Sequence, residues 1–133
     1  MTVPNLVSIT DLAWAKLDAI GRSDHQVLPV AVQDVDTGTV LMVAYVTQAA
    51  LRESDRRGQA VFFSTSKGEL HWKGETSGDF LELVDIRVNC EHNSLLMRVR
   101  MLGAGACHEH DPTGHPYTTC FHRTFEPITD VSE

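Results

Sequence analysis

The residues with the most chemical potential are three cysteines and a group of histidines in the second half of the chain. Cys90 ends an alternating apolar segment, and the tail contains Cys107-His108-Glu109-His110, His115, Cys120 and His122. Zinc prefers thiolate and imidazole ligands, and a catalytic zinc keeps three protein ligands and one open position for water. The pattern indicates a metal site, although its spacing is not that of a zinc finger. The alternative is that Cys90 packs in a buried strand and the tail histidines are solvated.

A second group of polar residues forms the segment Lys73-Gly74-Glu75-Thr76-Ser77-Gly78. Glycine lets the backbone approach an anion closely, and lysine, threonine and serine side chains supply hydrogen-bond donors. The segment is thus typical of a loop that holds phosphate. A polar hairpin turn has the same composition, and the pattern alone does not separate the two.

Three oxygen-bearing side chains flank Cys90. Asn89, Glu91 and Asn93 would share one face of an extended segment, and magnesium takes oxygen ligands. Only Glu91 carries a charge, so the predicted affinity for magnesium is low. A plain turn between two strands explains the same residues.

Composition narrows the class of protein before any fold is considered. The chain has 133 residues, the usual size of one domain, and its formal charge is −7. Nonspecific binding of nucleic acid needs a basic surface, so no nucleic-acid partner is expected. The sequence has no apolar run of about 20 residues and no secretion signal, so we expect a cytoplasmic protein with no membrane partner. An odd number of cysteines in a reducing compartment argues against a disulfide framework.

The hydrophobic periodicity predicts an α+β single domain over residues 1–133, with mainly antiparallel strands and two helices. One helix is predicted over Thr10–Ile20, and Thr47 and Gly58 are typical start and stop signals of a second helix ending at Arg56. Lys67–Gly78 and the tail after Gly103 are predicted to be irregular. The predicted strands are Val27–Val35 and Thr39–Val46, joined as a hairpin, then Ala60–Ser64, a strand from Phe80 to Cys90, and Ser94–Leu102. In the fourth strand, the residues predicted to share one face are Val84, Ile86, Val88 and Cys90.

Together these segments resemble the phosphoribosyl-AMP cyclohydrolase family of histidine biosynthesis, with a core from about Leu28 to Arg123. The matching stretches are Val32-Gln33-Asp34 with Val40-Leu41-Met42-Val43-Ala44-Tyr45, Ser64-Thr65-Ser66, Lys73 to Gly78, the Cys90 segment, Ala106-Cys107-His108 and Cys120-Phe121. The resemblance implies an intertwined homodimer that hydrolyses phosphoribosyl-AMP. In that reaction water adds at C6 of the purine ring and the N1–C6 bond opens.

The resemblance also implies roles for individual residues. Zinc would be held by Cys90 of one subunit and by Cys107 and Cys120 of the other, and it would supply hydroxide for attack on the ring. Three thiolates cancel the charge of the ion and make it a weaker acidifier of water, so a general base is expected. His108 is the first choice because an ordinary histidine pKa is about 6.5, and Glu75 is the second. The residues expected to bind substrate are Lys73, Gly74, Thr76, Ser77, Ser64 and Ser66.

The chain departs from the family pattern at the predicted magnesium and anion sites. Asn89, Glu91 and Asn93 replace three family carboxylates, and Ser64-Thr65-Ser66-Lys67 has one cation fewer than the family segment. These changes indicate a divergent member that binds little or no magnesium. A paralogue that acts on a related purine nucleotide or nucleoside is the alternative.

A second departure concerns the interval between Cys107 and Cys120, which is longer than in the family. His110 or His115 from this interval could occupy the fourth zinc position. A closed site of three cysteines and one histidine is structural. The protein would then be a non-catalytic dimeric scaffold.

Overall fold

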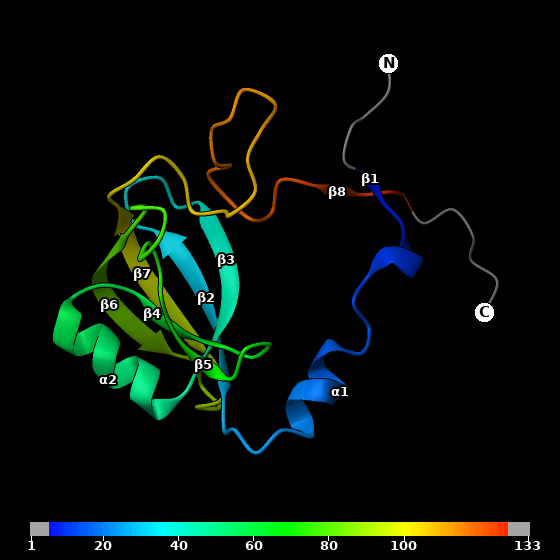
Figure 1. Ribbon diagram of the computed structural model, residues 1–133. Helices are drawn as coiled ribbons and strands as arrows, with labels where there is room; N and C mark the ends of the chain where they lie inside the picture. Colours follow the sequence, from blue (N-terminus) through cyan, green and yellow to red (C-terminus); the bar gives the residue numbers. More distant parts are fainter. Residues whose placement is uncertain (1–5, 128–133) are drawn as a thin grey trace.

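The described part of the chain is a four-stranded sheet with one helix and one hairpin packed against it, and a long tail that returns to the sheet edge (Figure 1). The computed structural model describes residues 6–127. Its elements, in chain order, are β1 (Leu6–Val7), the 3-10 helix η1 (Ile9–Asp11), α1 (Lys16–Gly21), β2 (Leu28–Asp34), β3 (Val40–Val46), α2 (Gln48–Arg57), β4 (Val61–Ser64), β5 (Glu69–Trp72), β6 (Leu81–Val88), β7 (Leu95–Met101) and β8 (Thr124–Phe125).

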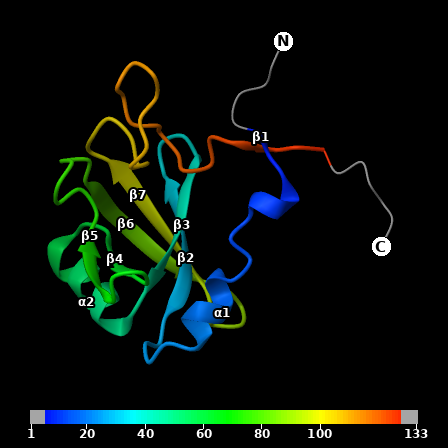
Figure 2. The same ribbon diagram turned by 45° about the vertical axis from the view of Figure 1, so that its right-hand side comes forward.

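The main sheet has the strand order β3-β2-β7-β6. β2 pairs antiparallel with β3 and parallel with β7, and β6 pairs antiparallel with β7. Figures 1 and 2 show α2 and the β4–β5 hairpin against the sheet, and the hydrophobic core lies between them. The prediction of a mainly antiparallel α+β domain is confirmed. The core residues include Val30, Val32, Leu41, Ala50, Phe62, Met97 and Val99.

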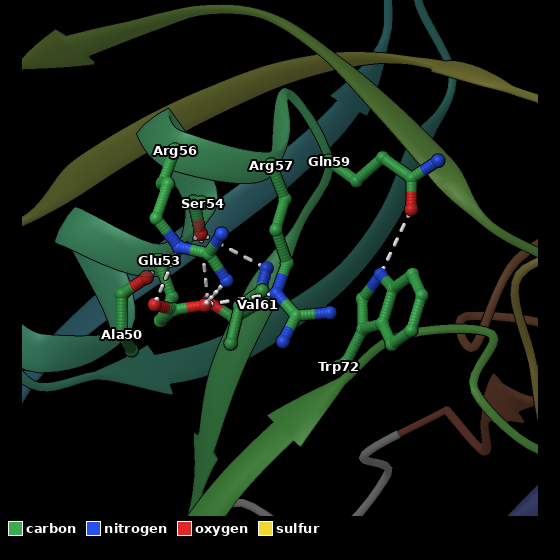
Figure 3. A network of polar contacts seen from close by, with 8 residues as sticks. All are labelled: Ala50, Glu53, Ser54, Arg56, Arg57, Gln59, Val61 and Trp72. Atoms are coloured by element: carbon green, nitrogen blue, oxygen red, sulfur yellow. Dashed lines mark hydrogen bonds and ion pairs between the residues drawn. The ribbon is translucent and has the colours of Figure 1, made fainter.

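Helix α2 has the predicted ends and is fixed to β4 by a buried serine. The Thr47 hydroxyl accepts a hydrogen bond from the N–H of Ala50 (3.1 Å), and Gly58 adopts a left-handed conformation (φ 66°) that ends the helix. Ser54 Oγ lies 2.9 Å from the carbonyl oxygen of Ala50 and accepts from the N–H of Val61 (2.9 Å). Figure 3 shows this contact between the helix and the strand.

Polar contacts at the end of α2 also position β5. Glu53 accepts hydrogen bonds from Arg56 and Arg57, and the Arg57 guanidinium lies 4.4 Å from the centroid of the Trp72 ring. The Trp72 indole N–H in turn donates to Gln59 (2.8 Å; Figure 3). The predicted loop over Lys67–Gly78 is therefore wrong in its first half, because β5 pairs antiparallel with β4 there.

The predicted helix over Thr10–Ile20 is wrong in its first half. Leu12 is in the extended conformation (φ −75°, ψ 149°), and the Trp14 indole N–H donates to the carbonyl of Ile9 (2.9 Å). This local contact forms a tight turn in place of the first helical turns. Trp14 is 70% exposed, so a helix extended through this residue would bury little apolar surface.

A β-bulge changes which side chains of β6 face the core. The register with β7 shifts between Leu83 and Asp85, which leaves Val84 as the extra residue and 42% exposed. Leu83 and Ile86 pack against the core on either side of the bulge. The predicted common face of Val84 and Ile86 is therefore wrong.

The tail is less irregular than predicted. β8 pairs in parallel with β1, so the two ends of the described chain lie side by side in Figures 1 and 2. Within residues 6–127, no helix has the length and apolar character that crossing a membrane requires.

Candidate metal centre

Backbone hydrogen bonds fold the tail so that two of the three cysteines meet. The N–H of Cys107 donates to the carbonyl of Tyr117 (3.0 Å), and the N–H of Tyr117 donates to the carbonyl of Glu109 (3.0 Å). The N–H of Cys120 donates to the carbonyl of Leu41 on β3 (2.7 Å). The two side chains are then close enough for Cys107 to raise the pKa of the Cys120 thiol.

Gly105 is required for this close approach. A Cβ atom at Gly105 would lie 2.6 Å from the carbonyl oxygen of Tyr117 and 2.8 Å from that of Pro116. Both contacts are to backbone, which cannot rotate away. Glycine therefore sets the distance between the two sides of the folded tail.

We expect Gly105→Ala to lower stability by about 1–3 kcal/mol and to reduce the zinc content of the purified protein, because the Tyr117 side of the tail must move. Thermal unfolding and metal analysis measure the two effects. Gly21→Ala is the matched control, since a Cβ there meets no atom within 4 Å. Equal zinc content in the two variants would contradict the role given to Gly105.

The two thiols have the chemistry of a metal-binding pair. Cys107 is buried, and its Sγ accepts a hydrogen bond from the N–H of Glu109 (3.4 Å). Desolvation and the adjacent Cys107 raise the pKa of the Cys120 thiol to about 11. A bound dication would stabilise both thiolates, and thiolate pairs favour zinc among the common divalent ions. The donor set therefore fits zinc.

Glu109 and His122 complete a group of possible ligands that the sequence analysis missed. One ligand atom from each of Cys107, Glu109 and His122 lies within 4.8 Å of the others. His122 Nε2 is 3.1 Å from Glu109 Oε1, and Arg123 donates to both oxygens of the same carboxylate. Arg123, with His122, lowers the pKa of Glu109 to about 2. A metal-binding histidine commonly holds such a carboxylate through its second ring nitrogen.

His122 differs from the other two possible ligands in the burial of its side chain and in the surroundings of its Nδ1 atom. Its side chain is only 7% exposed and stacks on the Tyr117 ring at 3.7 Å. Within residues 6–127, Nδ1 is buried and has no hydrogen-bond partner. A signal was present in the sequence, because side chains two residues apart in an extended segment, such as Cys120 and His122, share a face.

The two histidines that were predicted to compete for the metal lie elsewhere in the tail loop. His110 is exposed and pairs through its backbone with Pro116. His115 is exposed, and its Nδ1 lies 2.9 Å from the Thr113 hydroxyl. Neither belongs to the ligand group that contains Cys107 in the described residues.

Cys90 does not join the thiol pair within one chain. It is exposed and lies in the turn between β6 and β7, whereas the tail leaves the opposite end of β7 (Figure 1). The strand of seven residues separates the two ends by roughly 20 Å at about 3.4 Å per residue. A site with all three thiols therefore requires a second chain.

The predicted magnesium ligands hydrogen-bond to one another in the same turn. Asn89 Oδ1 accepts from the N–H groups of Asn93 and Ser94 (both 2.9 Å), and Asn93 Nδ2 donates to Glu91 (3.1 Å). His92 has a positive φ of 59° at the tip. These hydrogen bonds show that Asn89 and Asn93 stabilise the turn between β6 and β7.

A cavity of about 650 Å³ reaches Cys120 of the thiol pair. It brings together five of the predicted site residues and several that were not predicted. The predicted residues on its wall are Ser64, Ser66, Lys73, His108 and Cys120; the unpredicted polar ones include Tyr45, Lys67 and His71. Desolvation, with Lys73 and Lys67, lowers the pKa of His71, which keeps this imidazole neutral more readily than usual.

The rest of the predicted phosphate loop lies outside this cavity. Glu75, Thr76 and Ser77 are exposed, and Glu75 borders a separate hollow beside Arg56. Gly74 is buried with φ 96°, and a Cβ there would lie 2.6 Å from the N atom of Phe80. The absence of a side chain at Gly74 thus allows the loop to pack closely against Phe80.

The fold and the site together define a small α+β protein in which a cavity with lysine and hydroxyl side chains reaches one of two neighbouring thiols suited to zinc. A sequence model of the family described as phosphoribosyl-AMP cyclohydrolase matches residues 42–122. The chain is 44% identical to the phosphoribosyl-AMP cyclohydrolase of Haloarcula marismortui over 106 residues, which are 80% of this chain and 82% of that protein. The chain belongs to the phosphoribosyl-AMP cyclohydrolase family.

Two further relatives extend the comparison to bacteria. The phosphoribosyl-AMP cyclohydrolase of Marinobacter nauticus is 39% identical over 83% of this chain and 75% of its own length. The histidine biosynthesis bifunctional protein HisIE of Synechocystis is 40% identical over 88% of this chain but only 53% of its own length. The chain therefore corresponds to about half of that bifunctional protein.

Proposed function

We propose that this protein is a zinc-dependent phosphoribosyl-AMP cyclohydrolase of histidine biosynthesis. In the reaction, the oxygen of water bonds to C6 of the purine ring, the N1–C6 bond breaks, and N1 keeps the bonding electrons and takes a proton. The observation that carries the proposal is the cavity that places Cys120, the neighbour of Cys107, beside cationic and hydroxyl side chains. Family membership identifies the substrate, and the cavity supplies the matching chemistry.

We propose that zinc is held by Cys107 and Cys120 of one subunit and by Cys90 of the partner subunit. The homodimer follows from this sharing, because Cys90 and the tail of one chain lie at opposite ends of β7. When bound, zinc favours ionisation of water and so provides the nucleophile.

The protein's own residues would bind the substrate and move the proton. Lys73, Ser64 and Ser66 face the cavity and offer donors to phosphate and ribose oxygens. His108 lines the same cavity as Cys120, which supports it as the general base in preference to Glu75. Thr76, Ser77 and Gly74 then act by shaping the loop that begins at Lys73.

Incubation of the zinc-loaded protein with phosphoribosyl-AMP is the direct test, because ring opening changes the ultraviolet absorbance of the purine. We expect turnover of phosphoribosyl-AMP and none of AMP or adenosine. Turnover of AMP or adenosine alone would assign the protein to a related purine substrate. No loss of absorbance with any of the three would refute the proposed reaction.

Magnesium is expected to change this activity little, since only Glu91 among Asn89, Glu91 and Asn93 carries a charge. The same assay in magnesium-free buffer and with added magnesium measures the dependence. Strong stimulation by magnesium would show that these three residues form a second metal site.

A closed zinc site is the second candidate, and His122 is the observation that favours it. Within residues 6–127 its Nδ1 is buried and has no hydrogen-bond partner, and one nitrogen of its ring belongs to the ligand group with Cys107, so His122 could take the fourth position. The protein would then be a dimeric scaffold with a structural metal. X-ray absorption at the zinc edge separates the two: three sulfurs with one oxygen support the enzyme, and three sulfurs with one imidazole support the scaffold.

A further inference from the structure

All three lysines of the chain line the same cavity, although they come from distant parts of the sequence. Lys67 follows β4, Lys73 follows β5, and Lys16 opens α1 in the N-terminal segment. The formal charge of the chain is −7, so positive charge gathered at one cavity is not a general property of this surface.

The lysines also differ from the arginines in their partners. Seven of the eight arginines form ion pairs with carboxylates, and Arg52 donates to Gln48. Within residues 6–127, no lysine forms such a pair. Glu69 is the one acidic residue on the cavity wall. The cavity is therefore an electrostatic site for an anion.

Lys16 is held at the wall by a specific contact. Its Nζ donates to the Thr65 hydroxyl at 2.7 Å and lies 6.0 Å from the centroid of the Tyr45 ring. Residues of α1 and of β4 line a second cavity together, among them Lys16 and Phe63. Lys16, Thr65 and Ser66 border both cavities, so the ammonium group and the two hydroxyl groups can share an anion.

We propose that Lys16 is a phosphate-binding residue of the substrate site and that α1 forms one wall of that site. Lys16 lies outside the segment matched by the family model, residues 42–122. The inference rests on the proposed function for the identity of the substrate, phosphoribosyl-AMP. That substrate carries two phosphate groups, and the three lysines on the cavity wall supply cations for both.

The test compares Lys16→Met, Lys16→Arg and the control Arg22→Met in the zinc-loaded protein. Arg22 directly follows α1, is exposed and pairs with Asp18, so it has no cavity contact. Calorimetry gives the Kd of AMP and of adenosine, and turnover of phosphoribosyl-AMP gives KM and kcat. We expect Lys16→Met to raise KM and the Kd of AMP about tenfold or more, because a charged hydrogen bond is lost. We expect kcat and the Kd of adenosine to change less than about twofold, and arginine at position 16 to restore binding.

Three results would overturn the assignment: unchanged AMP binding in Lys16→Met, equal weakening of AMP and adenosine, or a wild-type protein that binds both ligands equally. Equal weakening would mean that Lys16 only anchors α1. A wild-type protein that binds AMP through Lys16 but does not hydrolyse phosphoribosyl-AMP would instead refute the proposed function and leave the Lys16 site standing.

Discussion

Replacement of Cys107 by serine is expected to remove zinc from the purified protein and to lower turnover of phosphoribosyl-AMP by about a thousandfold or more. A serine hydroxyl does not ionise near neutral pH, so it cannot replace a buried thiolate that the N–H of Glu109 supports. A metal ion contributes several kcal/mol to such a reaction, and each 1.36 kcal/mol is about tenfold in rate. Zinc analysis by mass spectrometry and the absorbance assay measure both effects.

His110→Ala is the matched control for this experiment, because His110 lies in the same tail but outside the ligand group. It should keep its zinc and its activity. Circular dichroism should show the same fold in both variants. Wild-type turnover by a metal-free Cys107→Ser protein would refute the proposed chemistry.

Mixing two inactive variants is expected to restore activity if the zinc site is shared between subunits. Cys90→Ser and Cys107→Ser each lack one ligand at both sites of their homodimers. In a heterodimer, one of the two sites receives Cys90 from one subunit and an intact tail from the other. Random assembly makes half of the dimers heterodimers, so coexpression should give about a quarter of the wild-type specific activity.

Coexpression of Cys107→Ser with Cys120→Ser is the control, since both defects lie in the tail and no combination produces an intact site. Recovery in the first pair alone supports sharing across the dimer. No recovery in either pair, with heterodimers demonstrated by native mass spectrometry, would show that Cys90 is not part of the site.

Local signals in the sequence predicted the hairpin of β2 and β3 and the helix α2 well. Their turn and cap residues act through contacts within a few positions, as the bond from Ala50 to Thr47 and the left-handed Gly58 show. The structure confirms these elements because no distant contact opposes them.

The elements that were wrongly predicted depend on contacts that a local pattern does not contain. The bulge at Val84 shifts the register of β6, and a shift of one residue moves each following side chain to the other face. β5 is short and polar, and it forms because β4 offers it a partner. The first half of the predicted N-terminal helix has no surface against which its apolar side chains are buried.

The candidate site was also predicted only in part, because some of its residues are brought together by contacts between distant segments. Cysteine and histidine content indicated a metal site, and the described structure joins Cys107 to Cys120 through backbone contacts of the tail. The sequence included His122 in that set but did not single it out, because its environment is set by Tyr117 and Glu109 after the tail has folded back. Lys16 could not be assigned from the sequence either, because only the fold brings it to Thr65.

The attachment of the tail to β3 has a consequence for solubility. β3 is an edge strand of the main sheet, and its carbonyls at Val40 and Leu41 accept hydrogen bonds from Thr119 and Cys120. Uncovered edge strands pair with strands of other molecules and start aggregation. A change that detaches the tail therefore exposes a surface for intermolecular pairing and would cause the protein to precipitate.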